Sequence, residues 1–169
     1  MSRLIYLDNA ATTKTAPEVV DAMIPYFTEH YGNPSSVYSF ASGNKEVVSR
    51  QREIIAQALG AQANEIYFTA GGSESDNWAL KATAEAYEKK GKHIITTKIE
   101  HHAILHTCEY LEKQRGFEIT YLDVDENGVV KLDELKKAIR PDTILISVMF
   151  ANNEIGTIQI GRASCRERV

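Results

Sequence analysis

Two glycines and a serine stand where a short apolar run gives way to a helical pattern, in the segment TAGGSESDN at residues 69–77. Paired glycines let the backbone approach an anion closely, and the first N–H groups of the helix that follows point toward it. Ser73 can add a hydroxyl, whereas Glu74 and Asp76 suit a phosphate only if they point away or cap the helix. The segment is neither a P-loop nor a Rossmann fingerprint. The pattern predicts either a tight, well-capped turn or a phosphate cradle.

The elements around this segment alternate. From about residue 60 onward, short β-type runs are followed by longer helical patterns, which is typical of an α/β sheet with helical layers. Ile104, Cys108 and Leu111 recur at helical spacing and predict one buried helix face, and Trp78 is expected in the core. We expect strands over residues 65–69, 93–97, 117–124 and 143–150, and helices over residues 17–30, 45–59, 73–90, 132–139 and around 104–111.

The composition is that of an ordinary globular protein. Of 169 residues, 43% are hydrophobic and 25% are charged, which suffices for one domain with a sizeable core. A net charge of −4 gives no electrostatic reason to expect nucleic acid or a membrane as partner. The N-terminus lacks the apolar region of a signal peptide, and no run approaches the length of a membrane span. With only Cys108 and Cys165 present, we expect a reducing, cytoplasmic location.

Five short motifs follow one another along the chain. They are YLDNAATT (6–13), GNPSS (32–36), GGSESDN (71–77), EHHAIL (100–105) and ANNEIGTIQ (151–159). In this order and spacing, residues 5–159 resemble the N-terminal part of the NifS/IscS-type cysteine desulfurases, which are class V members of the fold-type-I pyridoxal-phosphate enzymes. The resemblance implies an α/β fold, namely part of the large domain of a fold-type-I pyridoxal-phosphate-dependent transferase, with a mostly parallel sheet between helical layers.

The resemblance also implies roles for individual residues. Gly72 and Ser73 match the positions that hold the phosphate of pyridoxal 5′-phosphate. His101 matches the histidine that stacks on the pyridine ring and assists proton transfer, a role suited to a planar group that titrates near neutral pH. Asn153 matches the residue that hydrogen-bonds the cofactor's ring hydroxyl. Taken without the family, His101 reads as the start of a helix and Asn153 as a turn former.

The reaction implied by the resemblance is sulfur transfer. In the family, L-cysteine reacts on the cofactor, which serves as an electron sink; an enzyme cysteine takes the sulfur as a persulfide and leaves L-alanine. The sulfur then passes to an iron–sulfur scaffold or another acceptor protein, and the enzymes are homodimers. The family's Schiff-base lysine, acidic partner of the pyridine nitrogen and nucleophilic cysteine follow the NNEIGT motif. No lysine here matches the first, and neither Cys108 nor Cys165 matches the last, so we expect the 169-residue chain to be inactive by itself.

The expected domain organisation has three parts. By resemblance, residues 1–15 join a small domain and residues 16–159 form the N-terminal part of the cofactor-binding large domain. Residues 160–169, IGRASCRERV, break the preceding apolar pattern with three arginines in seven residues, and they match one reading frame of a common DNA-sequencing adapter. We expect this tail to be non-native; the alternative is a genuine basic tail.

Other functions remain open. The chain could come from another class V enzyme, such as a selenocysteine lyase or an aminotransferase, or it could be a non-catalytic anion-binding module that uses the Gly72–Ser73 turn. Residues 123–134 have the spacing of a calcium loop, but the strand-like FEITYL stands where an EF-hand needs a helix. His102 and His106 are four residues apart, as metal ligands can be, but no third ligand has suitable spacing. We therefore expect no metal site.

Overall fold

The computed structural model describes residues 4–159, which divide into two compact units with a boundary between Phe68 and Thr69. The prediction of a non-native tail at residues 160–169 lies outside the described residues. No helix within residues 4–159 combines the length and the apolar character that crossing a bilayer requires.

The first unit is helical. It contains α1 (Pro17–Thr28), α2 (Ser39–Leu59) and the short 3₁₀ helix η1 (Ala63–Glu65). A proline at the first position favours the start of α1, since its fixed φ is already helical and its missing N–H is not needed there. α2 ends at Gly60, whose left-handed backbone (φ 68°) closes the last turn. Both predicted helices are confirmed, although α2 begins six residues before the expected start at residue 45.

This unit buries little of its apolar surface. α1 has no buried residue among those described, and α2 buries only Ala41, Asn44 and Ala56. The exposed apolar side chains of α1, between 42% and 73% accessible, are Val19, Val20, Met23, Ile24, Tyr26 and Phe27. An amphipathic helix normally buries such a stripe, so packing within the described chain contributes little to the stability of α1.

The predicted strand over residues 65–69 is wrong. Glu65 ends η1, and Ile66 has an extended backbone (φ −99°, ψ 123°), yet residues 66–69 pair with no other strand of the described chain. The β-branched and aromatic residues favour the extended conformation, but a strand exists only where a neighbour accepts and donates the ladder hydrogen bonds.

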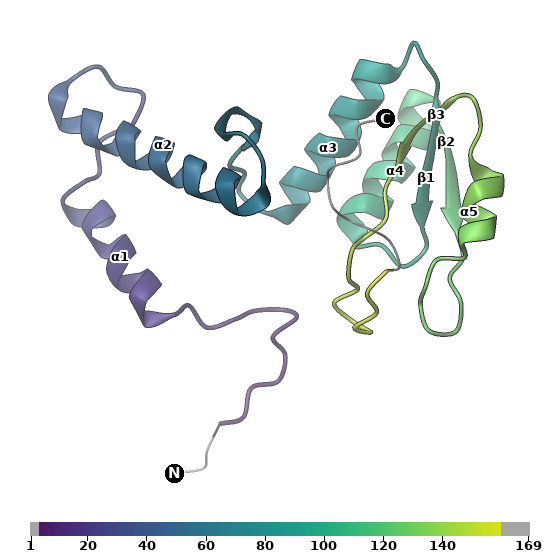
Figure 1. Ribbon diagram of the computed structural model, residues 1–169, viewed down its shortest axis with the longest axis horizontal. Coiled ribbons are helices and arrows are strands. Elements are labelled where there is room, and N and C mark those ends of the chain that lie inside the picture. The colour runs from purple at the N-terminus through teal and green to yellow at the C-terminus, as the bar shows by residue number, and fades with distance from the viewer. Residues whose placement is uncertain (1–3, 160–169) are drawn as a thin grey trace. The chain divides into compact units, whose positions relative to one another are not determined.

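The second unit is built on a parallel sheet, seen edge-on in Figure 1, in the order β2-β1-β3. Its strands are β1 (His93–Thr97), β2 (Glu118–Leu122) and β3 (Thr143–Ile146), and β1 pairs in parallel with both neighbours. The predicted α/β class is confirmed. The third strand is shorter than the expected 143–150 and only half-buried, because it lies at the edge of the described sheet.

Helices cover both faces of this sheet (Figure 1). α3 (Gly72–Tyr87) and α4 (His102–Arg115) pack on the face that carries Ile94, whereas α5 (Leu132–Ala138) packs on the face that carries Ile95. Both isoleucines are fully buried, because successive side chains of a strand point to opposite faces. The layered arrangement places the starts of α3 and α4 at the carboxyl edge of the sheet, which is the side where its three strands end.

The main core lies between the sheet and the α3–α4 layer. Ile104, Cys108 and Leu111 are all buried there, as their spacing predicts. Burial raises the pKa of the Cys108 thiol to about 11, so it is a small core residue and no nucleophile. Trp78 is not a core residue, because its side chain is 49% exposed; it stands two residues, or about 200°, from the inward-facing Leu80 on α3.

Candidate cofactor site at the carboxyl ends of the strands

The start of α3 presents free backbone donors. Gly71 caps the helix with an extended backbone, and its carbonyl accepts the first helical hydrogen bonds from the N–H groups of Glu74 and Ser75 (3.1 and 3.2 Å). The N–H groups of Gly72 and Ser73 come before these bonds and have no carbonyl one turn earlier to bind. Together with the helix dipole, they form an environment suited to an anion.

The acidic residue at this turn is directed away from the free donors. The Glu74 carboxylate accepts a hydrogen bond from the N–H of Ala70 at 2.6 Å, so it caps the backbone before the helix. At Gly72 an added Cβ would meet nothing within 4 Å. The space beside Gly72 is therefore not taken by this chain, and packing in the described residues does not require glycine there.

His101 is the N-cap of α4. Its backbone is extended (φ −62°, ψ 148°), and Nδ1 accepts a hydrogen bond from the N–H of Ala103 at 3.1 Å. In the neutral ring this bond leaves Nε2 as the protonated nitrogen. The side chain is exposed, so the ring is oriented by the cap and remains accessible.

A groove of about 400 Å³ between α3 and α4 brings two predicted site residues together. Its described lining comprises Ser73, Asn77, Lys81, His101, His102, Ala103, His106, Thr107 and Tyr110. Asn153 is not among these residues. It is exposed in the turn after β3, where its amide donates to the Glu154 carboxylate at 3.4 Å. The structure thus brings Ser73 and His101 to one groove and leaves Asn153 in the neighbouring loop.

Comparisons with known proteins bear on this arrangement. Residues 5–162 match the family model described as aminotransferase class-V. The chain belongs to this family. It is 60% identical over 159 residues to a cysteine desulfurase IscS of Clostridium botulinum, an alignment that covers 94% of this chain and 40% of the relative. The chain therefore spans about two fifths of the length of the relatives that it matches.

Solved structures of the family have the same fold. A NifS-like protein superposes with a TM-score of 0.87 at 46% identity, over 90% of this chain and 42% of the other. A structure named SspA in complex with cysteine superposes with a TM-score of 0.84 at 40% identity, over 89% of this chain and 43% of the other. The described sheet and its helices are part of a fold-type-I large domain, as expected.

The family uses pyridoxal phosphate, and the residues present fit that group. A phosphate needs donors and space, which the N–H groups of Gly72 and Ser73 and the open volume beside Gly72 provide. A planar aromatic ring needs a flat partner, which the exposed imidazole of His101 provides in the groove that Ser73 also lines. Ser73 and His101 thus offer a donor and a flat ring to one groove.

Two buried polar residues that the sequence analysis missed adjoin the candidates. Glu100 precedes His101 and Asn152 precedes Asn153, and each is only 8% exposed. Both make hydrogen bonds between the loops that follow β1 and β3. The available sequence signal is a polar residue directly before a candidate, at the carboxyl end of an apolar strand.

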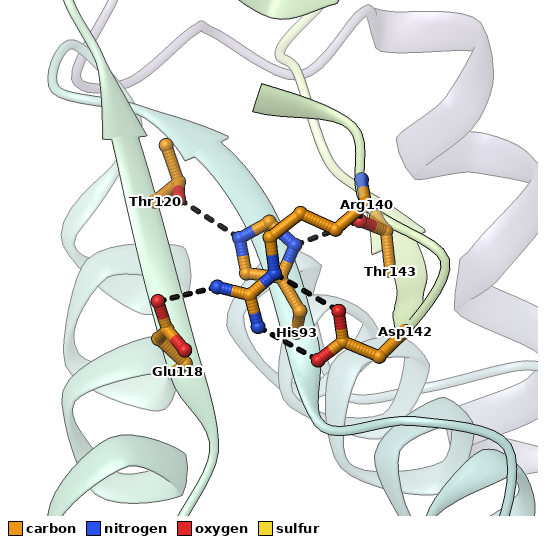
Figure 2. A network of polar contacts seen from close by, with 6 residues as sticks. All are labelled: His93, Glu118, Thr120, Arg140, Asp142 and Thr143. Atoms are coloured by element: carbon orange, nitrogen blue, oxygen red, sulfur yellow. Dashed lines mark hydrogen bonds and ion pairs between the residues drawn. The ribbon is translucent and has the colours of Figure 1, made fainter. Parts of the chain in front are cut away.

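The amino edge of the sheet, where its three strands begin, is centred on His93, the first residue of β1 (Figure 2). Its side chain is fully buried, and its two ring nitrogens bond the hydroxyls of Thr143 (Nδ1, 2.7 Å) and Thr120 (Nε2, 2.8 Å). Burial lowers the pKa of His93, and the nearby Arg140 lowers it further. The imidazole therefore links all three strands in its neutral form.

Arg140 covers this network (Figure 2). It forms a bidentate pair with Asp142, with Nε–Oδ1 2.9 Å and Nη2–Oδ2 2.7 Å, and it also pairs with Glu118. Hydrogen bonding to Arg140 lowers the pKa of both carboxyls. The polar groups at the amino ends of the strands therefore satisfy one another.

The remaining polar patterns form no metal site in the described chain. The rings of His102 and His106 stack at 5.3 Å, but no group of three or more potential ligands is placed to hold an ion within residues 4–159. In the calcium-like segment, the Asp125 carboxylate accepts from the N–H groups of Asn127 and Val129 (2.9 and 2.8 Å). This segment is a turn between β2 and α5, as its context predicts.

Proposed function

We propose that the protein to which these residues belong is a pyridoxal-phosphate-dependent cysteine desulfurase. The observation that carries the proposal is that Ser73, at the free start of α3, and His101, the cap of α4, line one groove between these helices, both of which start at the carboxyl edge of the sheet. Parallel α/β sheets bind ligands at this edge. The family match and the IscS relatives support the choice of reaction.

Each residue has a distinct task in this proposal. The N–H groups of Gly72 and Ser73 and the Ser73 hydroxyl hold the phosphate, while His101 stacks on the pyridine ring and moves a proton through Nε2. Asn153 donates to the ring hydroxyl from the loop after β3. When bound, the cofactor supplies the electron sink that lets L-cysteine lose its sulfur. A cysteine of the full-length protein other than Cys108 and Cys165 accepts that sulfur and passes it to an acceptor or iron–sulfur scaffold protein.

Assembly and location belong to the same proposal. We infer that the full-length protein is a homodimer in the cytoplasm. The buried, free thiol of Cys108 is consistent with a reducing compartment. Sedimentation of the full-length protein tests the oligomeric state directly, and a monomer would contradict it.

The experiment that tests the activity uses the full-length protein with L-cysteine and pyridoxal phosphate. We expect a bound-cofactor absorbance band and release of L-alanine in step with sulfide under reducing conditions. The 169-residue chain, assayed alone, should release no alanine above a control without protein. Greater turnover of L-selenocysteine would favour a selenocysteine lyase. Binding of inorganic phosphate without preference for pyridoxal phosphate would contradict the proposal in favour of an anion-binding module.

A matched pair of histidine variants tests the residue assignment. His101→Gln should lower kcat at least tenfold, because removing a general acid–base typically costs 10²–10⁴-fold, so tenfold is a cautious lower bound. His102→Gln alters the adjacent exposed histidine, which lines the same groove, and should leave kcat within about twofold. Equal losses in both variants would show that the groove, and not His101, is what matters.

A further inference from the structure

The loops that follow β1 and β3 are joined by a buried carboxylate. Oε1 of Glu100 accepts a hydrogen bond from the backbone N–H of Met149 at 2.7 Å and another from the Thr97 hydroxyl at 3.1 Å. Glu100 is only 8% exposed. Burying a carboxylate is costly unless its oxygens are bonded, so its position is fixed by these two donors.

A second bond joins the same loops in the opposite direction. Nδ2 of Asn152, also 8% exposed, donates to the backbone carbonyl of Ile99 at 3.0 Å. Its Oδ1 accepts from the N–H groups of Glu154 and Ile155 at 2.8 and 3.1 Å. Asn152 thus shapes its own turn and ties that turn to the loop after β1.

The two buried residues, Glu100 and Asn152, stand directly before the two exposed site candidates. Glu100 is followed by His101 and Asn152 by Asn153, so each candidate's backbone begins at a buried, hydrogen-bonded residue. We propose that Glu100 and Asn152 are positioning residues: their reciprocal bonds between the loops set where His101 and Asn153 stand relative to each other. This inference rests on the proposed function for its chemistry and on the contacts above for its geometry.

Losing either of these hydrogen bonds is costly because the bonded groups are buried. Burial raises the pKa of Glu100, while the bonds from Met149 and Thr97 act in the opposite sense. Removing the carboxylate leaves the Met149 N–H without its partner, and an unpaired buried donor is a large penalty. The loop can avoid that penalty only by moving, and a shift of about 1 Å in a supporting loop can displace a site from its working geometry.

The test uses the full-length protein and three variants. Glu100→Ala removes both bonds of the carboxylate. Asn152→Asp keeps the acceptor for the turn and removes the amide donor, which bonds the Ile99 carbonyl and, more weakly, the Met149 sulfur at 3.3 Å. Glu100→Gln keeps an acceptor at Oε1 and tests whether the bonds, and not the charge, are needed.

Two readouts are compared. The first is the dissociation constant of pyridoxal phosphate, measured by titration of the apo-protein. The second is the NMR resonance of the His101 ring in apo-protein labelled at histidine, assigned with His101→Gln. We expect Glu100→Ala and Asn152→Asp each to weaken binding about tenfold and to shift or broaden the His101 resonance, and Glu100→Gln to restore both within about twofold.

Asn44 supplies a matched control. It is likewise 8% exposed, and its amide donates to the backbone carbonyls of His30 and Gly32, both at 2.6 Å. Asn44→Asp should lower the melting temperature without changing either readout. If Glu100→Ala and Asn152→Asp behave like Asn44→Asp, the bonds of Glu100 and Asn152 are only structural and the inference is wrong. If Glu100→Ala fails to fold, Asn152→Asp decides.

Failure of the proposed function would look different. Wild-type protein that does not bind pyridoxal phosphate would contradict the cofactor assignment. The His101 resonance of apo-protein would still show whether Glu100 and Asn152 fix that ring, since it requires no cofactor.

Discussion

Polar side chains are bonded differently at the amino edge of the parallel sheet, where the strands begin, and at its carboxyl edge, where they end. At the amino edge, His93 is fully buried, both of its ring nitrogens are bonded, and the Arg140 side chain covers it (Figure 2). At the carboxyl edge, the buried Glu100 and Asn152 are bonded to backbone, whereas the residue after each is exposed. The polar groups of the amino edge bond one another, whereas the carboxyl edge leaves groups free for a ligand. This agrees with the general location of ligand sites in parallel sheets.

The largest effect should follow from emptying the amino edge. His93→Ala creates a cavity and leaves the hydroxyls of Thr120 and Thr143 without their partner, so the free energy of unfolding should fall by about 3 kcal/mol. Urea denaturation of the full-length protein measures this loss. Binding of pyridoxal phosphate to the folded fraction should be unchanged; a matching loss of affinity would mean that the two edges are not independent.

A change at the carboxyl edge should have the reverse signature. Gly72→Ala adds a Cβ where no protein atom lies within 4 Å, so the stability should stay the same or rise by up to about 1 kcal/mol. Pyridoxal phosphate should bind about tenfold less tightly, equivalent to about 1.4 kcal/mol, since the methyl group takes space next to the free donors. Gly43→Ala, also without a neighbour within 4 Å and inside α2, is the control that should leave affinity intact.

The edges should also differ in the sign of their pH dependence. The pKa of His93 is lowered from 6.5, so the unfolded state takes up a proton first and stability falls as the pH drops through 6.5, by at most about 1.4 kcal/mol per pH unit. The pKa of Glu100 is raised from 4.5, so its contribution is present below 4.5 and is lost as the pH rises through the raised value. Unfolding curves of wild type and His93→Gln between pH 5 and 8 should converge as the pH falls.

The smallest effect is expected at the surface of the amino edge. The Arg140 side chain is 34% exposed and its partners Glu118 and Asp142 are 66% and 45% exposed, so water and salt screen these pairs. Arg140→Met should lower the melting temperature less than His93→Ala does. The difference from wild type should shrink at 1 M salt, and a loss that persists there would mean that the pairs are not screened.

Much of the second unit could be predicted from the chain alone. The apolar run HIITT has the bounds of β1, and the spacing of Ile104, Cys108 and Leu111 indicates the buried face of α4. These features are local, since the period of the pattern fixes which side chains share a face. The free start of α3 could likewise be inferred, because glycines before an amphipathic run mark a helix terminus.

Features that depend on distant partners could not be predicted. Residues 65–69 have strand-forming side chains but no paired neighbour in the described chain, and Trp78 lies on the exposed side of α3. The partners that Glu100 and Asn152 find in the opposite loop stand 49 and 53 residues away in sequence, so no local pattern reveals these bonds. Ser73 and His101 were named by family resemblance, and their common groove required the tertiary structure.

The burial of Cys108 makes its alkylation rate a measure of how often the second unit opens. The thiol is inaccessible in the core between the sheet and α4, and its pKa is raised to about 11. A thiol reagent at pH 8 therefore meets almost no thiolate until that layer opens. In full-length protein with every cysteine except Cys108 replaced by serine, the rate at which Cys108 is alkylated would measure how often the second unit opens, and adding pyridoxal phosphate would show whether ligand binding slows that opening.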